Sequence, residues 1–320
     1  MYREKVVIGK GTEYPLNGLL TIPDGASGPV PAVVMVHGSG ASNMDEKVIK
    51  LTPFKDLADG LAAHGIASLR YDKRTFVHGR KMMKENAAGM TVREETIEDV
   101  LLALELLRSD KRIDSDNIFI LGHSMGAMLA PRIDAEGGNV KGLIMMAGTP
   151  HRLEDIVLRQ LEQSRGGNPL LGCVIGLERK YFAKKFSGLY DMSDEEARKK
   201  KFAGNISLYY FKEMGQKTAA DYLLESDKPV LIMQGGRDFQ VLGADDFKAF
   251  HEQLAGRDNI TYKLYPELNH CFVKAIYDDI TKASKEYGVE RHIGEDVIAD
   301  IAEFVLVSRG KTVGEDTSAI

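Results

Sequence analysis

Five residues near the middle of the chain, Gly122-His123-Ser124-Met125-Gly126, limit its fold more than any other stretch. They follow the apolar run Ile118-Phe119-Ile120-Leu121, and Ala127-Met128-Leu129-Ala130 can begin a helix behind them. A serine between two glycines at a strand-to-helix junction is typical of a sharp turn whose strained backbone lifts the hydroxyl out of the sheet. The pentapeptide can arise by chance, but its flanks predict the strand, the turn and the helix together.

Further apolar runs of strand length lie on both sides of this turn, and stretches of helical periodicity separate them. The runs are 31–37, 66–71, 143–147 and 229–234, and residues 260–265 alternate between apolar and polar side chains as a last strand. Two more runs, 5–8 and 16–22, are expected to pair antiparallel at the edge of the sheet, whereas the charged stretch from Asp72 to Glu95 is expected to be a loop. The alternation predicts an α/β protein with a mostly parallel central sheet flanked by helices.

The alternation of strands and helices stops between Thr149 and Lys228. We predict a helical cap, or lid, at 149–228, inserted into a core domain made of 1–148 and 229–308. The polar residues 309–320 are expected to form a flexible tail. Within the insertion, Tyr209, Tyr210 and Phe211 belong to an aromatic cluster that either packs the cap onto the core or lines a substrate pocket.

Composition excludes several classes of function. The net charge of −5 is small, and basic residues are scattered among acidic ones, so we expect no nucleic-acid partner. No apolar run is long enough to span a bilayer, and we expect no membrane association. Cys173 and Cys271 form neither a disulfide framework nor a metal-binding pattern, so we expect no metal and no cofactor. With no export signal visible in the first residues, a cytoplasmic location is expected.

Three residues that can act together each follow a predicted strand: Ser124, Asp238 and His270. A serine hydroxyl needs a base to become nucleophilic, and a histidine base needs a carboxylate to fix its tautomer. Because the carboxyl ends of parallel strands meet at one edge of a sheet, the three side chains are expected to converge there. The competing residues are His251, His292, Asp245, Asp246 and Glu267.

Acyl transfer at a serine also requires an oxyanion hole, which is a pair of N–H groups that bind the oxygen gaining charge. We expect one donor from the backbone of Met125 and the other from Ser39 in the glycine-rich segment after strand 31–37, with Gly38 and Gly40 as alternatives. His37 and His123 flank these segments and are expected to be structural.

The chain resembles the α/β-hydrolases, and within them bacterial carboxylesterases related to cinnamoyl and feruloyl esterases and to the dienelactone-hydrolase-like group. The blocks that carry the resemblance are His37-Gly38-Ser39-Gly40, Arg70-Tyr71-Asp72-Lys73-Arg74, 122–126, Gln234-Gly235-Gly236-Arg237-Asp238 and Leu268-Asn269-His270. One departure is Thr75, where this group commonly has glycine. Arg70, Asp72 and Arg74 either pair to hold their loop or meet a substrate carboxylate.

The residues and the resemblance together imply a serine hydrolase that cleaves short to medium or aromatic carboxylic esters through an acyl-enzyme. The substrate would be a small molecule, and a homodimer is left open. Alternatives on the same machinery are a thioesterase, an acyltransferase or a peptidase-type amide hydrolase. An alternative of another class is a ligand-binding receptor on a hydrolase scaffold that has lost turnover.

Overall fold

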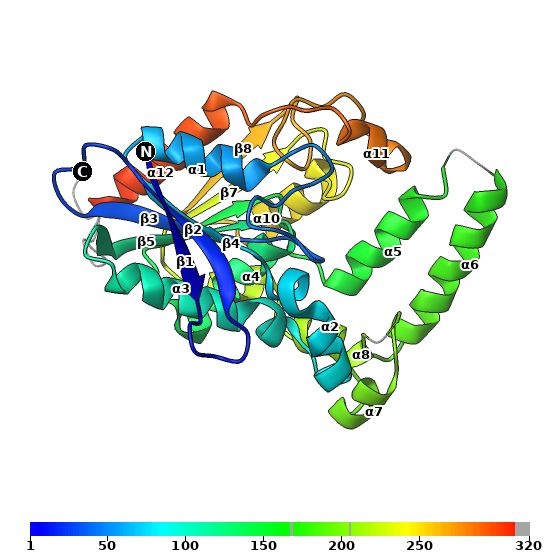
Figure 1. Ribbon diagram of the computed structural model, residues 1–320. Helices are drawn as coiled ribbons and strands as arrows, with labels where there is room; N and C mark the ends of the chain where they lie inside the picture. Colours follow the sequence, from blue (N-terminus) through cyan, green and yellow to red (C-terminus); the bar gives the residue numbers. More distant parts are fainter. Residues whose placement is uncertain (167–168, 205, 311–320) are drawn as a thin grey trace.

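The protein, described by a computed structural model over residues 1–166, 169–204 and 206–310, is built around one eight-stranded sheet in the order β1-β2-β4-β3-β5-β6-β7-β8 (Figure 1). The strands are β1 (Tyr2–Ile8), β2 (Leu16–Ile22), β3 (Val30–Val36), β4 (Ala67–Tyr71), β5 (Ile113–His123), β6 (Gly142–Met146), β7 (Val230–Gly235) and β8 (Ile260–Tyr265). The pairs β1–β2 and β2–β4 are antiparallel and the remaining pairs are parallel. The mostly parallel sheet with an antiparallel edge is therefore confirmed.

Helices connect these strands from β3 onward and follow the last one. They are α1 (Pro53–Ala63), α2 (Arg74–Asn86), α3 (Glu98–Ser109), α4 (Met125–Ile133), α5 (Leu153–Gln163), α6 (Pro169–Phe186), α7 (Asp194–Lys199), α8 (Leu208–Met214), α9 (Ala219–Leu224), α10 (Lys248–Gln253), α11 (Ala283–Glu286) and α12 (Glu295–Arg309). Short π- or 3₁₀-helical turns are η1 (Arg93–Ile97), η2 (Asp134–Gly138), η3 (Gly243–Phe247) and η4 (Ile280–Lys282). Among the described residues, none of the helices combines the length and apolar content needed to cross a membrane.

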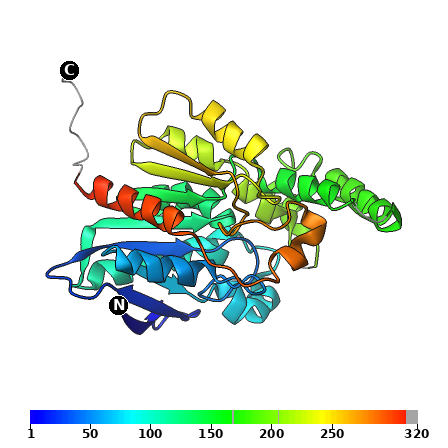
Figure 2. The same cartoon turned by 90° about the horizontal axis from the view of Figure 1, so that it is seen from above.

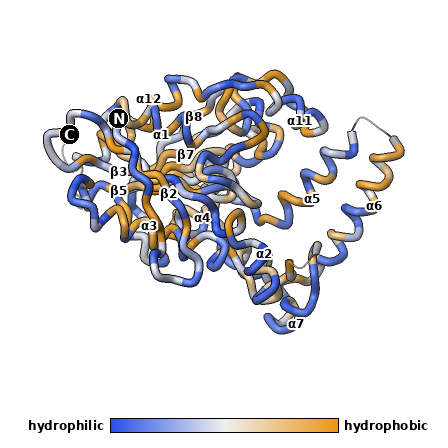
Figure 3. Tube along the Cα trace, viewed as in Figure 1, coloured by the Kyte–Doolittle hydropathy of each residue, from blue (hydrophilic) through white to orange (hydrophobic). Residues whose placement is uncertain are grey.

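The continuous apolar runs of the central strands are explained by burial of both faces. In β3, Val34 and Val36 belong to one hydrophobic cluster, and the alternating Val33 and Met35 belong to the other. Helices α3 and α4 cover the first face and α1 and α12 cover the second, and α1 and α12 lie side by side (Figure 2). Apolar residues are accordingly concentrated in the central strands (Figure 3). Because successive side chains of a strand point to opposite faces of the sheet, a continuous apolar run supplies apolar side chains to both layers.

Between β6 and β7, the described residues form the five helices α5 to α9 and add no strand to the sheet. Helices α5 and α6 pack against each other and project from the rest of the molecule (Figure 1). Helix α9 contacts α4, the helix that follows Ser124, and α5 contacts α8. This helical segment therefore lies on the side of the sheet where Ser124 is found.

The prediction of a loop from Asp72 to Glu95 is wrong, because α2 occupies residues 74 to 86. Its polar sequence lacks an apolar stripe: only Arg74 and Met82 are buried, and Phe76 is 54% exposed. Hydrophobic periodicity cannot reveal a helix of this kind. At the other end of the chain α12 ends at Arg309, the first residue of the predicted tail 309–320, and residues 311–320 lie outside the described residues.

Candidate active site

Ser124 stands at the junction of β5 and α4 in a strained backbone conformation, with φ 54° and ψ −118°. A non-glycine residue rarely adopts a positive φ, and such strain is often stored at functional sites. Only glycine fits at positions 122 and 126, because a side chain there would collide with neighbouring backbone atoms. A Cβ on Gly122 would lie 2.2 Å from the Gly126 carbonyl oxygen, and one on Gly126 would lie 2.1 Å from the Val36 carbonyl oxygen. The junction therefore has the geometry of the sharp turn predicted from the sequence.

Asp238 and His270 form a buried hydrogen-bonded pair at the carboxyl ends of β7 and β8. His270 Nδ1 lies 2.7 Å from Asp238 Oδ2. The other oxygen, Asp238 Oδ1, accepts hydrogen bonds from the N–H groups of Gln240 and Val241 at 2.7 and 3.0 Å. Gln234 donates to Asp238 Oδ2 at 3.1 Å. The carboxylate is fixed by four donors, so it can hold the His270 ring with Nδ1 protonated and Nε2 free to accept a proton.

The loop that carries His270 is held from both sides. Asn269 donates to Glu286 Oε1 at 2.7 Å, and its own Oδ1 accepts from the N–H of Cys271 at 3.0 Å. Glu286, which is fully buried, also accepts from the N–H of Tyr277 at 2.6 Å. Because these are hydrogen bonds to a carboxylate inside the protein, they restrain the loop strongly.

His123 links the serine turn to this loop. Its Nε2 donates to the His270 carbonyl oxygen at 2.9 Å, and the two imidazole rings are 4.7 Å apart. Ser124, half-buried, makes no side-chain hydrogen bond with any described residue, so its hydroxyl is available. In ligand-free enzymes a nucleophile and its base are often not yet in a tight hydrogen bond.

The segment after β3 packs directly on Ser124, because a Cβ on Gly38 would lie 3.1 Å from Ser124 Cβ. The Gly38 N–H donates to Glu46 Oε1 at 2.7 Å, which removes Gly38 from the candidate oxyanion donors. The N–H groups of Ser39 and Met125 have no hydrogen-bond partner within the described ranges. Both residues line the cavity that contains Ser124.

Glu46 and His123 form a second buried pair beneath this segment. Glu46 Oε2 and His123 Nδ1 are 3.0 Å apart but are not aligned as a hydrogen bond. Burial acts to lower the pKa of His123, but the Glu46 carboxylate and the His270 carbonyl oxygen together outweigh burial and raise that pKa. By contrast, burial lowers the pKa of His37 to about 4, and His37 Nε2 contacts the Asn43 carbonyl oxygen at 3.0 Å. The two histidines flank the site and hold its loops.

A cavity of about 430 Å³ opens above Ser124. Most of its wall is apolar, and it includes Met82, Met83, Met90, Met128, Leu153, Ile156, Val157 and Ile206. Of the three aromatic residues predicted for the pocket, Tyr210 and Phe211 line this cavity and Tyr209 does not. The Tyr209 ring instead stacks against the Arg198 guanidinium, 3.5 Å away. The volume is within the range of pockets that hold small organic ligands.

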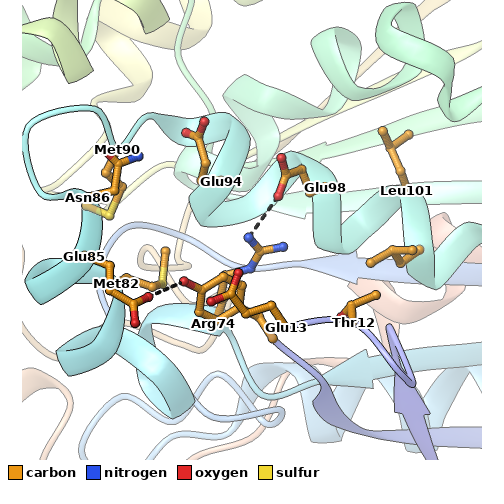
Figure 4. A pocket seen from close by; sticks show the side chains of 12 residues that line it. Thr12, Glu13, Arg74, Met82, Glu85, Asn86, Met90, Glu94, Glu98 and Leu101 are labelled. Carbon is orange, nitrogen blue, oxygen red and sulfur yellow. Dashed lines mark hydrogen bonds and ion pairs between the residues drawn. The ribbon is translucent and has the colours of Figure 1, made fainter.

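A second, larger cavity of about 730 Å³ is lined by residues of α2, η1 and α3, among others, and contains none of the three predicted catalytic residues (Figure 4). Acidic side chains, including Glu13, Glu85 and Glu94, surround it, and Arg74 is paired there with Glu98 at 2.9 Å. Met82 and Met90 line both cavities. These two side chains therefore form part of the wall between them.

The competing residues have other partners. His251 stacks on Tyr262 at 3.7 Å, and His292 contacts Asp56 at 3.0 Å. Asp246 is buried against Thr149 and Arg159, and Asp245 and Glu267 are exposed. None of them contacts Asp238 or His270 among the described residues.

The charged residues of the 70–74 block pair within the protein. Arg70 bonds Asp45 at 2.9 Å, Asp72 accepts from the Met44 N–H at 2.9 Å, and Arg74 holds Asp99. Burial raises the pKa of the Cys271 thiol well above its usual value, so the thiol stays protonated. No group of three or more His, Cys, Asp or Glu side chains that could hold a metal ion is found in the described part of the chain.

The pairing of two residues beside the site was not predicted from the sequence. Lys73 and Glu95 are buried and 2.6 Å apart, and Lys73 Nζ also donates to the Gly38 carbonyl oxygen at 2.9 Å. They are 22 positions apart in a charged stretch that was expected to be a loop, so no local pattern marks them. Lys73 belongs to the 70–74 block, but its pairing with Glu95 could not be seen there.

Comparison with known proteins agrees with this architecture. The esterase EstD from Thermotoga maritima is 34% identical over 291 residues, which cover 91% of this chain and 65% of that protein. Est1E from Butyrivibrio proteoclasticus, solved with ferulic acid bound, superposes with a TM-score of 0.59 at 18% identity, covering 96% of this chain and 100% of that one. The Pyrococcus furiosus esterase Pf2001 superposes with a TM-score of 0.57 at 15% identity, and the superposition covers 97% of this chain and 92% of that one.

The structural likeness establishes the α/β-hydrolase fold. Residues 28–274, which include β3 to β8 and all three predicted catalytic residues, match the family described as serine aminopeptidase, S33. The match extends over most of the 320 residues. This chain therefore belongs to the serine aminopeptidase family of α/β-hydrolases.

Proposed function

We propose that this protein hydrolyses carboxylic esters, with Ser124 as nucleophile, His270 as base and Asp238 as the group that orients His270. The observation that carries the proposal is the strained Ser124 in the wall of an apolar cavity, together with the 2.7 Å contact between His270 and Asp238. The similarity to the esterases EstD and Est1E supports the choice of ester.

The reaction proceeds in two acyl transfers. Ser124 Oγ attacks the ester carbonyl carbon while its proton passes to His270 Nε2, and the N–H groups of Ser39 and Met125 bind the resulting oxyanion. Collapse of this intermediate breaks the bond to the alcohol, which leaves with the proton from His270 and gives the acyl-enzyme. Water then loses a proton to His270 and attacks the acyl carbon. As this second intermediate collapses, His270 returns the proton to Ser124 Oγ, and the acid and the free serine are released.

The described cavity favours an ester over the free amino end of a peptide. An aminopeptidase needs a carboxylate to receive the substrate ammonium, and the acidic residue that lines this cavity is Glu95. Its two oxygens are already engaged by Lys73 and by the Tyr210 hydroxyl, each at 2.6 Å. The apolar wall suits medium or aromatic acyl groups, and we propose that helices α5 to α9 act as the cap that encloses them.

Kinetic comparison and active-site labelling test this proposal. We expect a higher kcat/KM for nitrophenyl esters than for aminoacyl nitroanilides with a comparable acyl group. We also expect a fluorophosphonate to label one serine, which peptide mass mapping should identify as Ser124. Labelling of another serine, or faster turnover of the anilides, would contradict it.

The wall between the two cavities predicts a change in acyl preference. Replacing Met82 by alanine should join the active-site cavity to the larger one and let a longer chain enter. Burial of two further methylene groups is worth roughly 1.6 kcal/mol, so the kcat/KM ratio of decanoate to butyrate esters should rise about tenfold. Met83→Ala is the matched control, since Met83 lines the active-site cavity alone, and an equal rise in both variants would refute this role of Met82.

A further inference from the structure

The peptide group between Gly38 and Ser39 is held by a buried cation. Lys73 Nζ donates to the Gly38 carbonyl oxygen at 2.9 Å, and the Lys73 side chain is only 2% exposed. The Lys73 N–H also donates to the Ser42 carbonyl oxygen at 3.0 Å. Both the backbone and the ammonium of one residue at the start of α2 thus bind the segment that packs on Ser124.

The Gly38 carbonyl and the Ser39 N–H belong to the same peptide unit. No peptide bond in the described residues is cis, so this carbonyl and this N–H point in opposite directions. A cation that fixes the carbonyl therefore fixes the direction of the N–H. A charge-assisted hydrogen bond to the carbonyl also polarises the amide and makes its N–H a stronger donor.

A buried ammonium is stable only when it is paired, and here Glu95 supplies the pair at 2.6 Å. Glu95 Oε2 accepts a hydrogen bond from the Tyr210 hydroxyl at 2.6 Å. Tyr210 belongs to α8, in the helical segment between β6 and β7, and its hydroxyl is 3.6 Å from Met125 Sδ. A continuous chain of contacts thus runs from α8 through Glu95 and Lys73 to the Gly38–Ser39 peptide.

We infer that Lys73 is a positioning residue for the oxyanion hole, and that Glu95 and Tyr210 couple the seating of α8 to the direction of the Ser39 N–H. The inference rests on the proposed ester hydrolysis at Ser124. Lys73 does not touch the substrate. It acts through the peptide that binds the oxyanion, so its removal should weaken binding of the transition state and leave binding of the ground state intact.

The test uses a double variant, Lys73→Met with Glu95→Gln, because removing Lys73 alone would leave a buried unpaired carboxylate. Loss of one oxyanion donor typically costs about 100- to 1000-fold in rate, so we expect kcat for a nitrophenyl ester to fall about 100-fold with KM changed less than about twofold. A trifluoromethyl ketone, which adds Ser124 Oγ and forms an oxyanion, should bind about 100-fold more weakly. The matching primary amide, which does not react, should bind as it does to the wild type.

The matched control is Lys228→Met with Asp134→Asn. Lys228 Nζ bonds a carboxylate oxygen of Asp134 at 2.7 Å, but Lys228 lies just before β7 and Asp134 lies in η2, so this pair is outside α8 and away from the Gly38–Ser39 peptide. Its kcat should stay within about twofold of wild type. If the first double variant does not fold by circular dichroism, Tyr210→Phe removes a single hydroxyl and should lower kcat and ketone affinity together, by roughly threefold.

The outcomes separate the two proposals. A wild-type protein that hydrolyses esters, together with a folded double variant of unchanged kcat and ketone affinity, overturns the role of Lys73 alone. Equal weakening of ketone and amide binding also overturns it, because that pattern indicates general disruption of the pocket. A wild-type protein that neither hydrolyses esters nor binds the ketone overturns the proposed function and this inference with it.

Discussion

Ser124→Ala should lower kcat for nitrophenyl ester hydrolysis by about a millionfold, the scale seen when the nucleophile of a serine hydrolase is removed. Ser39, Thr75, Thr149 and Tyr210 also place hydroxyl groups in the cavity wall, but of these hydroxyl residues Ser124 alone has the strained backbone with positive φ. The substitution keeps Cβ and hence the contact with Gly38. The protein should therefore stay folded, with a thermal midpoint within about 2 °C of wild type.

Ser109→Ala provides the control for this experiment. Ser109 is exposed at the end of α3, and its hydroxyl bonds only the Leu106 carbonyl oxygen among the described residues. That variant should retain wild-type kcat and fluorophosphonate labelling, whereas Ser124→Ala should lose both. Appreciable ester turnover by folded Ser124→Ala protein would remove the serine from the mechanism.

The strands and the serine turn were predictable because each rests on a local pattern. The apolar runs of β3 to β7 have the length of buried strands, and the strained turn needs glycine at 122 and 126, where the sequence has it. The pairing of Asp238 with His270 could be anticipated from topology, since both follow strands whose carboxyl ends meet at one edge of the sheet.

What the sequence could not supply are contacts between polar residues far apart in the chain. The Lys73–Glu95 pair depends on α2, a helix that lacks an apolar stripe, and Glu46 meets Gly38 across a loop with φ 49° at Glu46 itself. The directions of the aromatic side chains on α8 could not be predicted either. Tyr209 and Tyr210 are adjacent on α8 and so point about 100° apart, which sends one to Arg198 and the other to the cavity.

Asp238→Asn is expected to have the second largest effect, a fall in kcat of about ten-thousandfold with little change in KM. The N–H groups of Gln240 and Val241 would keep the amide oxygen of the new side chain, so its NH₂ group would face His270. That NH₂ group would donate to His270 Nδ1 and stabilise the tautomer with a proton on Nε2. Such a ring cannot accept the Ser124 proton, although every side chain keeps its place.

The control separates this electronic effect from loss of charge in the same region. Asp245→Asn, in the neighbouring turn η3, removes an exposed carboxylate and should leave kcat within about twofold of wild type. Trifluoromethyl ketone binding should weaken strongly in Asp238→Asn, because the adduct needs a protonated imidazole that Asp238 stabilises, whereas binding of the unreactive amide should not change. If kcat of Asp238→Asn stayed within tenfold of wild type, another residue would have to supply the carboxylate that orients His270. The 2.7 Å contact between Asp238 and His270 would then have only a structural role.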